Sequence, residues 1–168
     1  MFLCFYCGSK IWTYNDEVIA IKIQYYRIFY YTVQTFNIQM RKNISSGAKW
    51  EDIVGYSRAV VMGNSIEISG TVAVDGDNNL VGKGDAYAQT KFILEKISVV
   101  LKDAGFTLTD VVRTRMFVTD IAKWEEVGRA HGEFFKLIKP ATSMVEVKGL
   151  ISPEYLVEIE VTAIRETT

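Results

Sequence analysis

The chain has 168 residues, of which 49% are apolar and 23% are charged, with 12 Gly and only 2 Pro. This composition predicts one globular domain with a substantial core, and it excludes a disordered or collagen-like chain. The formal net charge of −1 provides no overall attraction to nucleic acid or to an anionic membrane, so neither is expected as a partner.

The composition changes near Met40. Residues 1–39 hold 11 of the 21 aromatic side chains and both cysteines, with one Gly and no Pro. Charged residues interrupt every long apolar run in this segment, so we expect neither a signal peptide nor a transmembrane helix. We expect residues 1–39 to be an N-terminal extension or a mis-assigned start, and residues 40–168 to form the single domain. N-terminal sequencing of protein from its native host would decide between these alternatives.

The two cysteines, Cys4 and Cys7, form a C-x-x-C pair. A zinc site needs four ligands at compatible spacing, and the single histidine, His131, is far along the chain. No metal site is therefore expected. A cytoplasmic location is the default, because no targeting segment is visible.

After Met40 the sequence first predicts a hairpin and a long helix. Two alternating runs, residues 56–62 and 65–74, flank the turn dipeptide Gly63-Asn64 and predict a β-hairpin. Asp85 then stands as an N-cap before apolar residues at three- and four-residue spacing, and Gly105 is expected to end this helix.

The remaining sequence predicts three strands and one helix. Residues 111–119 alternate like a strand, and Asp120 is a candidate cap for a second helix, which Pro140 stops. The last two strands are expected at residues 142–148 and 156–164. This order predicts an α+β domain with an antiparallel or mixed sheet and both helices on one face.

Alternation along the strands assigns side chains to the two faces of this sheet. Toward the helices we expect Ile66, Ile68, Gly70, Val72, Val112, Met116, Val118, Val157, Ile159, Val161 and Ala163. The other face then carries Glu67, Ser69, Thr71, Arg113, Arg115, Phe117, Glu158, Glu160 and Thr162. Such a mixed face is either a wetted surface with weak ion pairs or an interface between subunits, where a cleft can hold a small ligand.

The second helix should pack an apolar stripe onto the sheet. Its inner positions are expected to be Trp124, Val127, His131 and Phe134. We therefore interpret His131 as a packed, hydrogen-bonded side chain rather than a catalytic one.

Several stretches, among them NSIEISGTVAV, DVVRTRMFVTDIAKWEEV, PATSMVEV and YLVEIEVTAI, resemble the reactive intermediate deaminase (Rid) family in order and spacing. The family is also labelled YjgF-like, or L-PSP endoribonuclease/translation-inhibitor-like. The resemblance covers residues 44–165 and implies a chorismate mutase-like subunit, assembled as a homotrimer with clefts between subunits. It further implies hydrolysis of reactive enamines and imines to a keto acid and ammonia, without a cofactor.

The resemblance carries site residues over by position. Tyr56 matches a tyrosine that lines the cleft, Ser69 and Gly70 match the backbone beside the ligand, and Glu158 matches the carboxylate that orients water.

The chain departs from the family pattern in the motif that contains the carboxylate-binding arginine. The family's carboxylate-binding arginine corresponds to Thr142, and the cysteine that follows it in the motif corresponds to Met144. The chain thus resembles a divergent member that lacks the arginine. Its residues at the ligand-binding motif are Thr142, Ser143 and Met144. Arg115, on the polar sheet face, is the candidate replacement cation, unless it only neutralises Glu158 or Glu160.

Three functions are compatible with these residues. The first is a cofactor-independent hydrolase of enamines, imines or related small carbonyl metabolites, with Glu158 as the catalytic group and Arg115 as the anion anchor. The second is a non-catalytic ligand-binding or regulatory trimer. The third is an endoribonuclease-like activity, which the net charge and the lack of a recognisable His/Lys pair for phosphodiester cleavage oppose. The expected partners are a small molecule and further copies of the chain.

Overall fold

The computed structural model describes residues 22–27 and 41–166 of a chain that divides into two units, Met1–Ile38 and Gln39–Thr168. In the first unit, residues 22–27 are helical with exposed side chains, while Cys4 and Cys7 lie outside the described residues. The second unit contains β1 (Arg41–Ile44), α2 (Lys49–Val54), β2 (Ala59–Met62), β3 (Ser65–Thr71), α3 (Ala86–Asp103), β4 (Val111–Val118), α4 (Trp124–Phe135), β5 (Ala141–Glu146) and β6 (Val157–Ile164). Of these elements, only β1 and α2 were not expected from the sequence.

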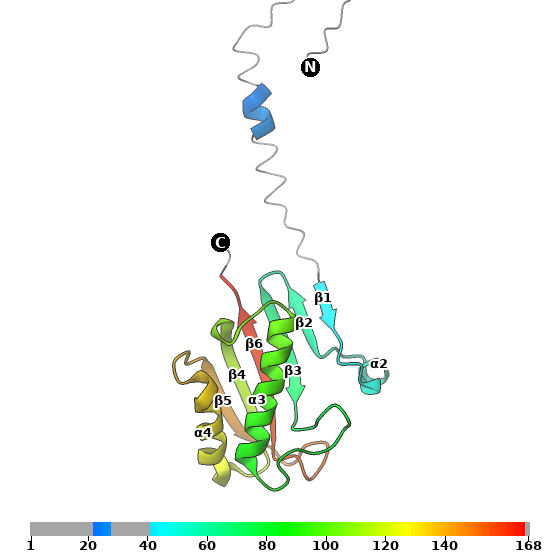
Figure 1. The fold of residues 1–168 in the computed structure, drawn as a ribbon, viewed down its shortest axis with the longest axis vertical. Coiled ribbons are helices and arrows are strands. Elements are labelled where there is room, and N and C mark those ends of the chain that lie inside the picture. The colour runs from blue at the N-terminus through cyan, green and yellow to red at the C-terminus, as the bar shows by residue number, and fades with distance from the viewer. Residues whose placement is uncertain (1–21, 28–40, 167–168) are drawn as a thin grey trace, which may run out of the picture. The chain divides into compact units, whose positions relative to one another are not determined.

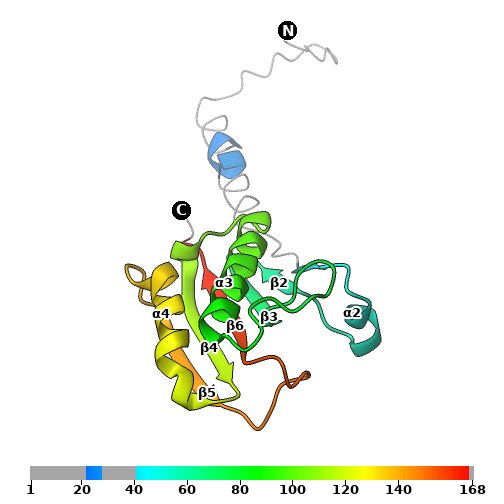
Figure 2. The same ribbon diagram turned by 60° about the horizontal axis from the view of Figure 1, so that its bottom comes forward.

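The strands form one mixed six-stranded sheet in the order β1-β2-β3-β6-β4-β5. Neighbouring strands are antiparallel except β4 and β5, which run parallel. Helices α3 and α4 lie on the same face of this sheet (Figures 1 and 2). The predicted α+β architecture, with both helices on one face, is confirmed.

The core lies between the two helices and the sheet. It is formed by buried side chains from α3, β3, β4, α4 and β6, including Ile93, Leu94, Ile97, Leu101, Ile66, Met116, Val127, Phe135, Ile159 and Val161. Asp85 caps α3 as predicted, because its Oδ1 accepts a hydrogen bond from the Ala88 amide at 2.9 Å. Gly105 follows the last turn of α3 with φ +78°, the left-handed conformation that ends many helices.

A β-bulge in β3 changes which of its side chains face the helices. Ile68 pairs with Val161 and Thr71 pairs with Ile159, so Ser69 and Gly70 together lie opposite one residue of β6. Thr71 is therefore buried among the helix-facing side chains. The prediction that Gly70 and Val72 face the helices, and that Thr71 faces away, is wrong for this reason.

A second bulge, in β4, displaces Val112. Val111 pairs with Ala163 and Arg113 pairs with Thr162, so Val112 is the extra residue and is 42% exposed. Val111 takes the buried place that the alternation assigned to Val112. The arginines remain on the face opposite the helices, as predicted.

Helix α4 begins later than the sequence predicts. Asp120 caps a short 3-10 turn, Ile121–Lys123, by accepting a hydrogen bond from the Ala122 amide at 2.9 Å. The α-helix then starts at Trp124, which is 55% exposed, so the prediction that Trp124 belongs to the inner stripe is wrong.

Among the described residues, no helix has both the length and the apolar content needed to cross a membrane.

Candidate functional site

The carboxylate of Glu158 lies on the sheet face opposite the helices, next to the bulge in β3. Glu158 pairs with Phe117 of β4, and both side chains are half-buried. On its other side the carboxylate lies against Gly70: a Cβ at Gly70 would overlap Oε1 and lie only 2.8 Å from Cδ. The bulge thus presents the one residue type that leaves room for this carboxylate.

Burial raises the pKa of the Glu158 carboxyl, the nearby negative charge of Glu160 raises it further, and the positive charge of Arg58 lowers it. No hydrogen bond or ion pair with another described residue engages this carboxylate. A carboxyl group with a raised pKa and free oxygens has the properties of a general acid or base.

Arg58 is a site residue that the sequence reasoning missed. It precedes β2, and its Nη2 donates hydrogen bonds to the backbone carbonyls of Ser69 and Gly70, the latter at 3.0 Å. Burial lowers the pKa of its guanidinium, an effect that Tyr56, Glu51 and Glu158 oppose. Alternation along the run YSRAVVM was the available signal for Arg58. It puts Arg58 on the same face as Val60, which is the face opposite the helices.

Arg115 forms an exposed ion pair. Its Nη1 lies 3.5 Å from Oε2 of Glu160, and the two side chains are 48% and 35% exposed. Such surface pairs contribute about 0 to 1 kcal/mol. The geometry therefore supports the alternative that Arg115 neutralises Glu160, while its use as an anion anchor stays a prediction.

The three motif residues on β5 lie on different faces of the sheet. Thr142 pairs with Thr114, and Met144 pairs with Met116, so both face the helices. Ser143 pairs with Arg115 and shares the face of Glu158. Within one chain, the structure therefore gathers Ser69, Gly70, Arg115, Ser143 and Glu158 on one face and separates Thr142 and Met144 from them.

Tyr56 lies at an open hollow of about 390 Å³ that Ser57 and Glu51 also line. Its side chain is 41% exposed.

In the described ranges, no group of three His, Cys, Asp or Glu side chains is arranged to hold a metal ion.

Thr142 belongs to a chain of hydrogen bonds that starts at His131. Thr142 Oγ1 donates to the Pro140 carbonyl at 3.0 Å and lies 2.9 Å from Thr114 Oγ1, which lies 3.0 Å from His131 Nε2. Since each hydroxyl has one proton, Thr114 donates to Thr142, and His131 donates to Thr114 through Nε2. Burial lowers the pKa of His131, and its ring packs on Phe135. The prediction of a packed, hydrogen-bonded histidine is confirmed.

We expect Thr114→Val to lower the free energy of unfolding by about 1–3 kcal/mol, because it leaves His131 Nε2 without its partner. Thr90→Val is the matched control. Thr90 is equally buried and bonds the Ala86 carbonyl, which still accepts a helical backbone hydrogen bond after the substitution. Urea unfolding of both variants measures the difference, and an equal effect at the two positions would contradict the inferred chain.

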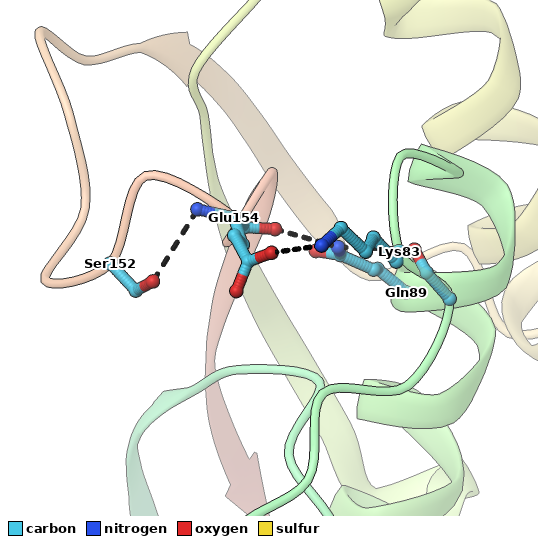
Figure 3. Close-up of polar contacts among 5 residues, drawn as sticks. Lys83, Gln89, Ser152 and Glu154 are labelled. Carbon is cyan, nitrogen blue, oxygen red and sulfur yellow. Dashed lines mark hydrogen bonds and ion pairs between the residues drawn. The ribbon is translucent and has the colours of Figure 1, made fainter.

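Buried Gln89 of α3 fixes the segment that leads into Glu158. Its Nε2 donates to the Glu154 carbonyl at 3.0 Å, and its Oε1 accepts from the Leu156 amide at 2.9 Å. Lys83 Nζ pairs with the Glu154 carboxylate at 2.6 Å (Figure 3). These contacts join α3 and the loop before it to the segment that leads into β6 and Glu158.

A family model described as Endoribonuclease L-PSP matches residues 47–165. Among curated proteins, the chain is 36% identical over 124 residues to an uncharacterised protein of Streptomyces coelicolor, covering 74% of this chain and 92% of the relative. It is 34% identical over 111 residues to a RutC family protein of Pyrococcus abyssi, covering 66% of this chain and 87% of the relative.

Solved structures agree with this match. A Mycobacterium tuberculosis member of the YjgF/YER057c/UK114 family is 48% identical, with a TM-score of 0.67, covering 75% of this chain and 100% of that one. A Yersinia pestis protein of the conserved Rid family is 33% identical, with a TM-score of 0.67 and the same coverage of each chain. The mixed sheet with its two helices thus matches the chorismate mutase-like fold of YjgF-family structures.

Proposed function

Because the chain belongs to the Endoribonuclease L-PSP family, whose members include the YjgF and Rid proteins, we propose that it is a cofactor-independent hydrolase of reactive imines and enamines. The substrates would be small imino acids or related carbonyl derivatives, which it converts to a keto acid and ammonia. The single observation that carries this proposal is Glu158: a carboxylate with a raised pKa, free oxygens and a fixed place against Gly70.

In the proposed reaction, Glu158 is the general acid and base. It moves a proton from water to the imine nitrogen while the water oxygen bonds to the imine carbon. It then moves the hydroxyl proton of the resulting carbinolamine to the same nitrogen. The carbon–nitrogen bond breaks, ammonia leaves, and the carbon becomes the carbonyl of the keto acid.

We further propose that the site is a cleft between copies of the chain in a homotrimer. Helices α3 and α4 lie on the opposite face of the sheet, and the polar face around Glu158 carries half-buried Phe117 together with charges of both signs. A neighbouring copy would exclude water from this face, and its β5 could place Thr142 and Met144 opposite Glu158. Exclusion of water strengthens the electrostatic interactions that such a site uses.

The test is to generate imines in place and measure their conversion. An amino-acid oxidase or a threonine dehydratase supplies the imine, and keto-acid release is recorded with and without the protein. We expect the protein to accelerate release above the spontaneous rate. No acceleration, combined with saturable binding of small carboxylates, would instead favour a ligand-binding or regulatory trimer. Native mass spectrometry of the same sample tests the assembly, and a lone monomer would contradict the proposed cleft.

A further inference from the structure

Arg58 has an unusual electrostatic environment among the charged residues that the structure describes. Burial of its side chain disfavours the charged form, yet none of the ion pairs among the described residues includes it. Its Nη2 is bound by two neutral carbonyls, and its Nε is fully buried without a hydrogen-bond partner. A desolvated guanidinium with no counter-ion is costly, and an anionic ligand would relieve that cost.

The nearby carboxylates do not supply this counter-ion. Glu51 accepts hydrogen bonds from the Ser46 amide at 2.8 Å and from Ser46 Oγ at 2.6 Å. Glu158 attracts Arg58 electrostatically, but no ion pair joins them. Arg58 therefore retains donors that an external anion could use.

Arg58 and Glu158 are placed so that one small molecule can contact both, with its carboxylate at Arg58 and its reacting carbon at Glu158. Both side chains contact the same residue, because Arg58 donates to the Gly70 carbonyl and the Glu158 carboxylate lies where a Gly70 side chain would be. In an α-imino acid, the carboxylate is bonded directly to the carbon that water attacks. Such a substrate needs its cation and its general base side by side, and Arg115 instead faces Glu160.

The geometry points to Arg58 as the residue that binds the carboxylate of the imino-acid substrate. This assignment rests on the proposed function in one respect, namely that the face carrying Glu158 binds the ligand. It also places the anion beside Gly70 instead of at Thr142, whose hydroxyl is already bonded to the Pro140 carbonyl.

The experiment compares a charged ligand with its neutral counterpart. Calorimetric titration of the full chain in its native assembly measures the affinity for pyruvate and for methyl pyruvate, which lacks the negative charge. We expect the parent to prefer pyruvate. Arg58→Gln should weaken pyruvate binding by roughly tenfold to a hundredfold and leave methyl pyruvate binding unchanged. Arg58→Lys, which keeps the charge but not the fork of donors, should recover part of the loss.

Arg113→Gln is the charge-matched control, because it removes a positive charge from the same sheet face, where Arg113 pairs with Thr162. We expect it to change pyruvate affinity by less than about threefold, as surface charges do. Equal weakening of both ligands in Arg58→Gln would mean that Arg58 only holds the bulge, and it would overturn the assignment. Loss of the pyruvate preference in Arg115→Gln alone, or no preference in the parent, would also overturn it.

Imine turnover, recorded on the same samples, separates this assignment from the proposed function. If the parent hydrolyses imines but shows no Arg58-dependent preference for pyruvate, the assignment of Arg58 is overturned and the proposed hydrolase function is retained. An Arg58-dependent preference without turnover would support the assignment and contradict the hydrolase.

Discussion

Replacing Glu158 with Gln is expected to lower kcat for imine hydrolysis by about 10²- to 10⁴-fold, the usual contribution of a positioned general acid or base. The amide has nearly the same shape but cannot accept and return a proton. Burial disfavours the charge of Glu158 in the folded protein, so its removal should not lower the melting temperature at pH 7. Keto-acid release from a freshly generated imine measures the loss, and a melting curve shows that the variant is folded.

The pH dependence gives an independent check on the same residue. The pKa of Glu158 is raised above its usual value of 4.5, and the ionised form is the one that takes the proton from water. Activity of the parent should therefore fall as the pH is lowered through this raised pKa, with a midpoint above 4.5. Glu160→Gln removes the like charge that helps to raise this pKa, so its acid limb should move to lower pH.

Two results would contradict this role for Glu158. Near-parental turnover by Glu158→Gln would mean that another group handles the protons. An acid limb that stays in place in Glu160→Gln would mean that the limb belongs to a group other than Glu158.

The periodic part of the fold could be predicted from the sequence. Apolar residues at helical spacing with Asp85 before them, and strict alternation from Val157 to Ala163, are local patterns that depend only on the chain itself. β1 and α2 have 4 and 6 residues, which is too short for a periodic signal. The two bulges were missed because an extra residue is defined by the pairing with β6, and not by the residues of β3 or β4 alone.

The candidate site was predictable to a different degree at each residue. Alternation along β6 put Glu158 on the outward face, and the resemblance to the family assigned Ser69 and Gly70 to the ligand. Alternation along YSRAVVM places Arg58 on the outward face, but its burial against the carbonyls of the bulge depends on the folded structure and has no signal in the sequence. Thr142 and Met144 matched the family motif by position, but the parallel register with β4 turns them toward the helices.

Gly70→Ala should lower imine turnover by about 10²-fold, because a displacement of roughly 1 Å at a reacting group costs that much. The added Cβ overlaps Glu158 Oε1, which is the end of a flexible side chain, so the carboxylate can move aside. Gly70 does not adopt a positive φ, so Ala introduces no backbone strain there. The expected cost in unfolding free energy is therefore within about 1 kcal/mol.

The double variant shows whether the loss acts through Glu158. In the Glu158→Gln background, general base catalysis is already absent, so Gly70→Ala should have a much smaller effect on turnover than in the parent. Gly132→Ala is the matched control, since a Cβ at Gly132 meets no atom within 4 Å. It should leave turnover unchanged. Full additivity of the two substitutions would contradict the placement of Glu158 by Gly70, because it would mean that the bulge affects turnover by another route.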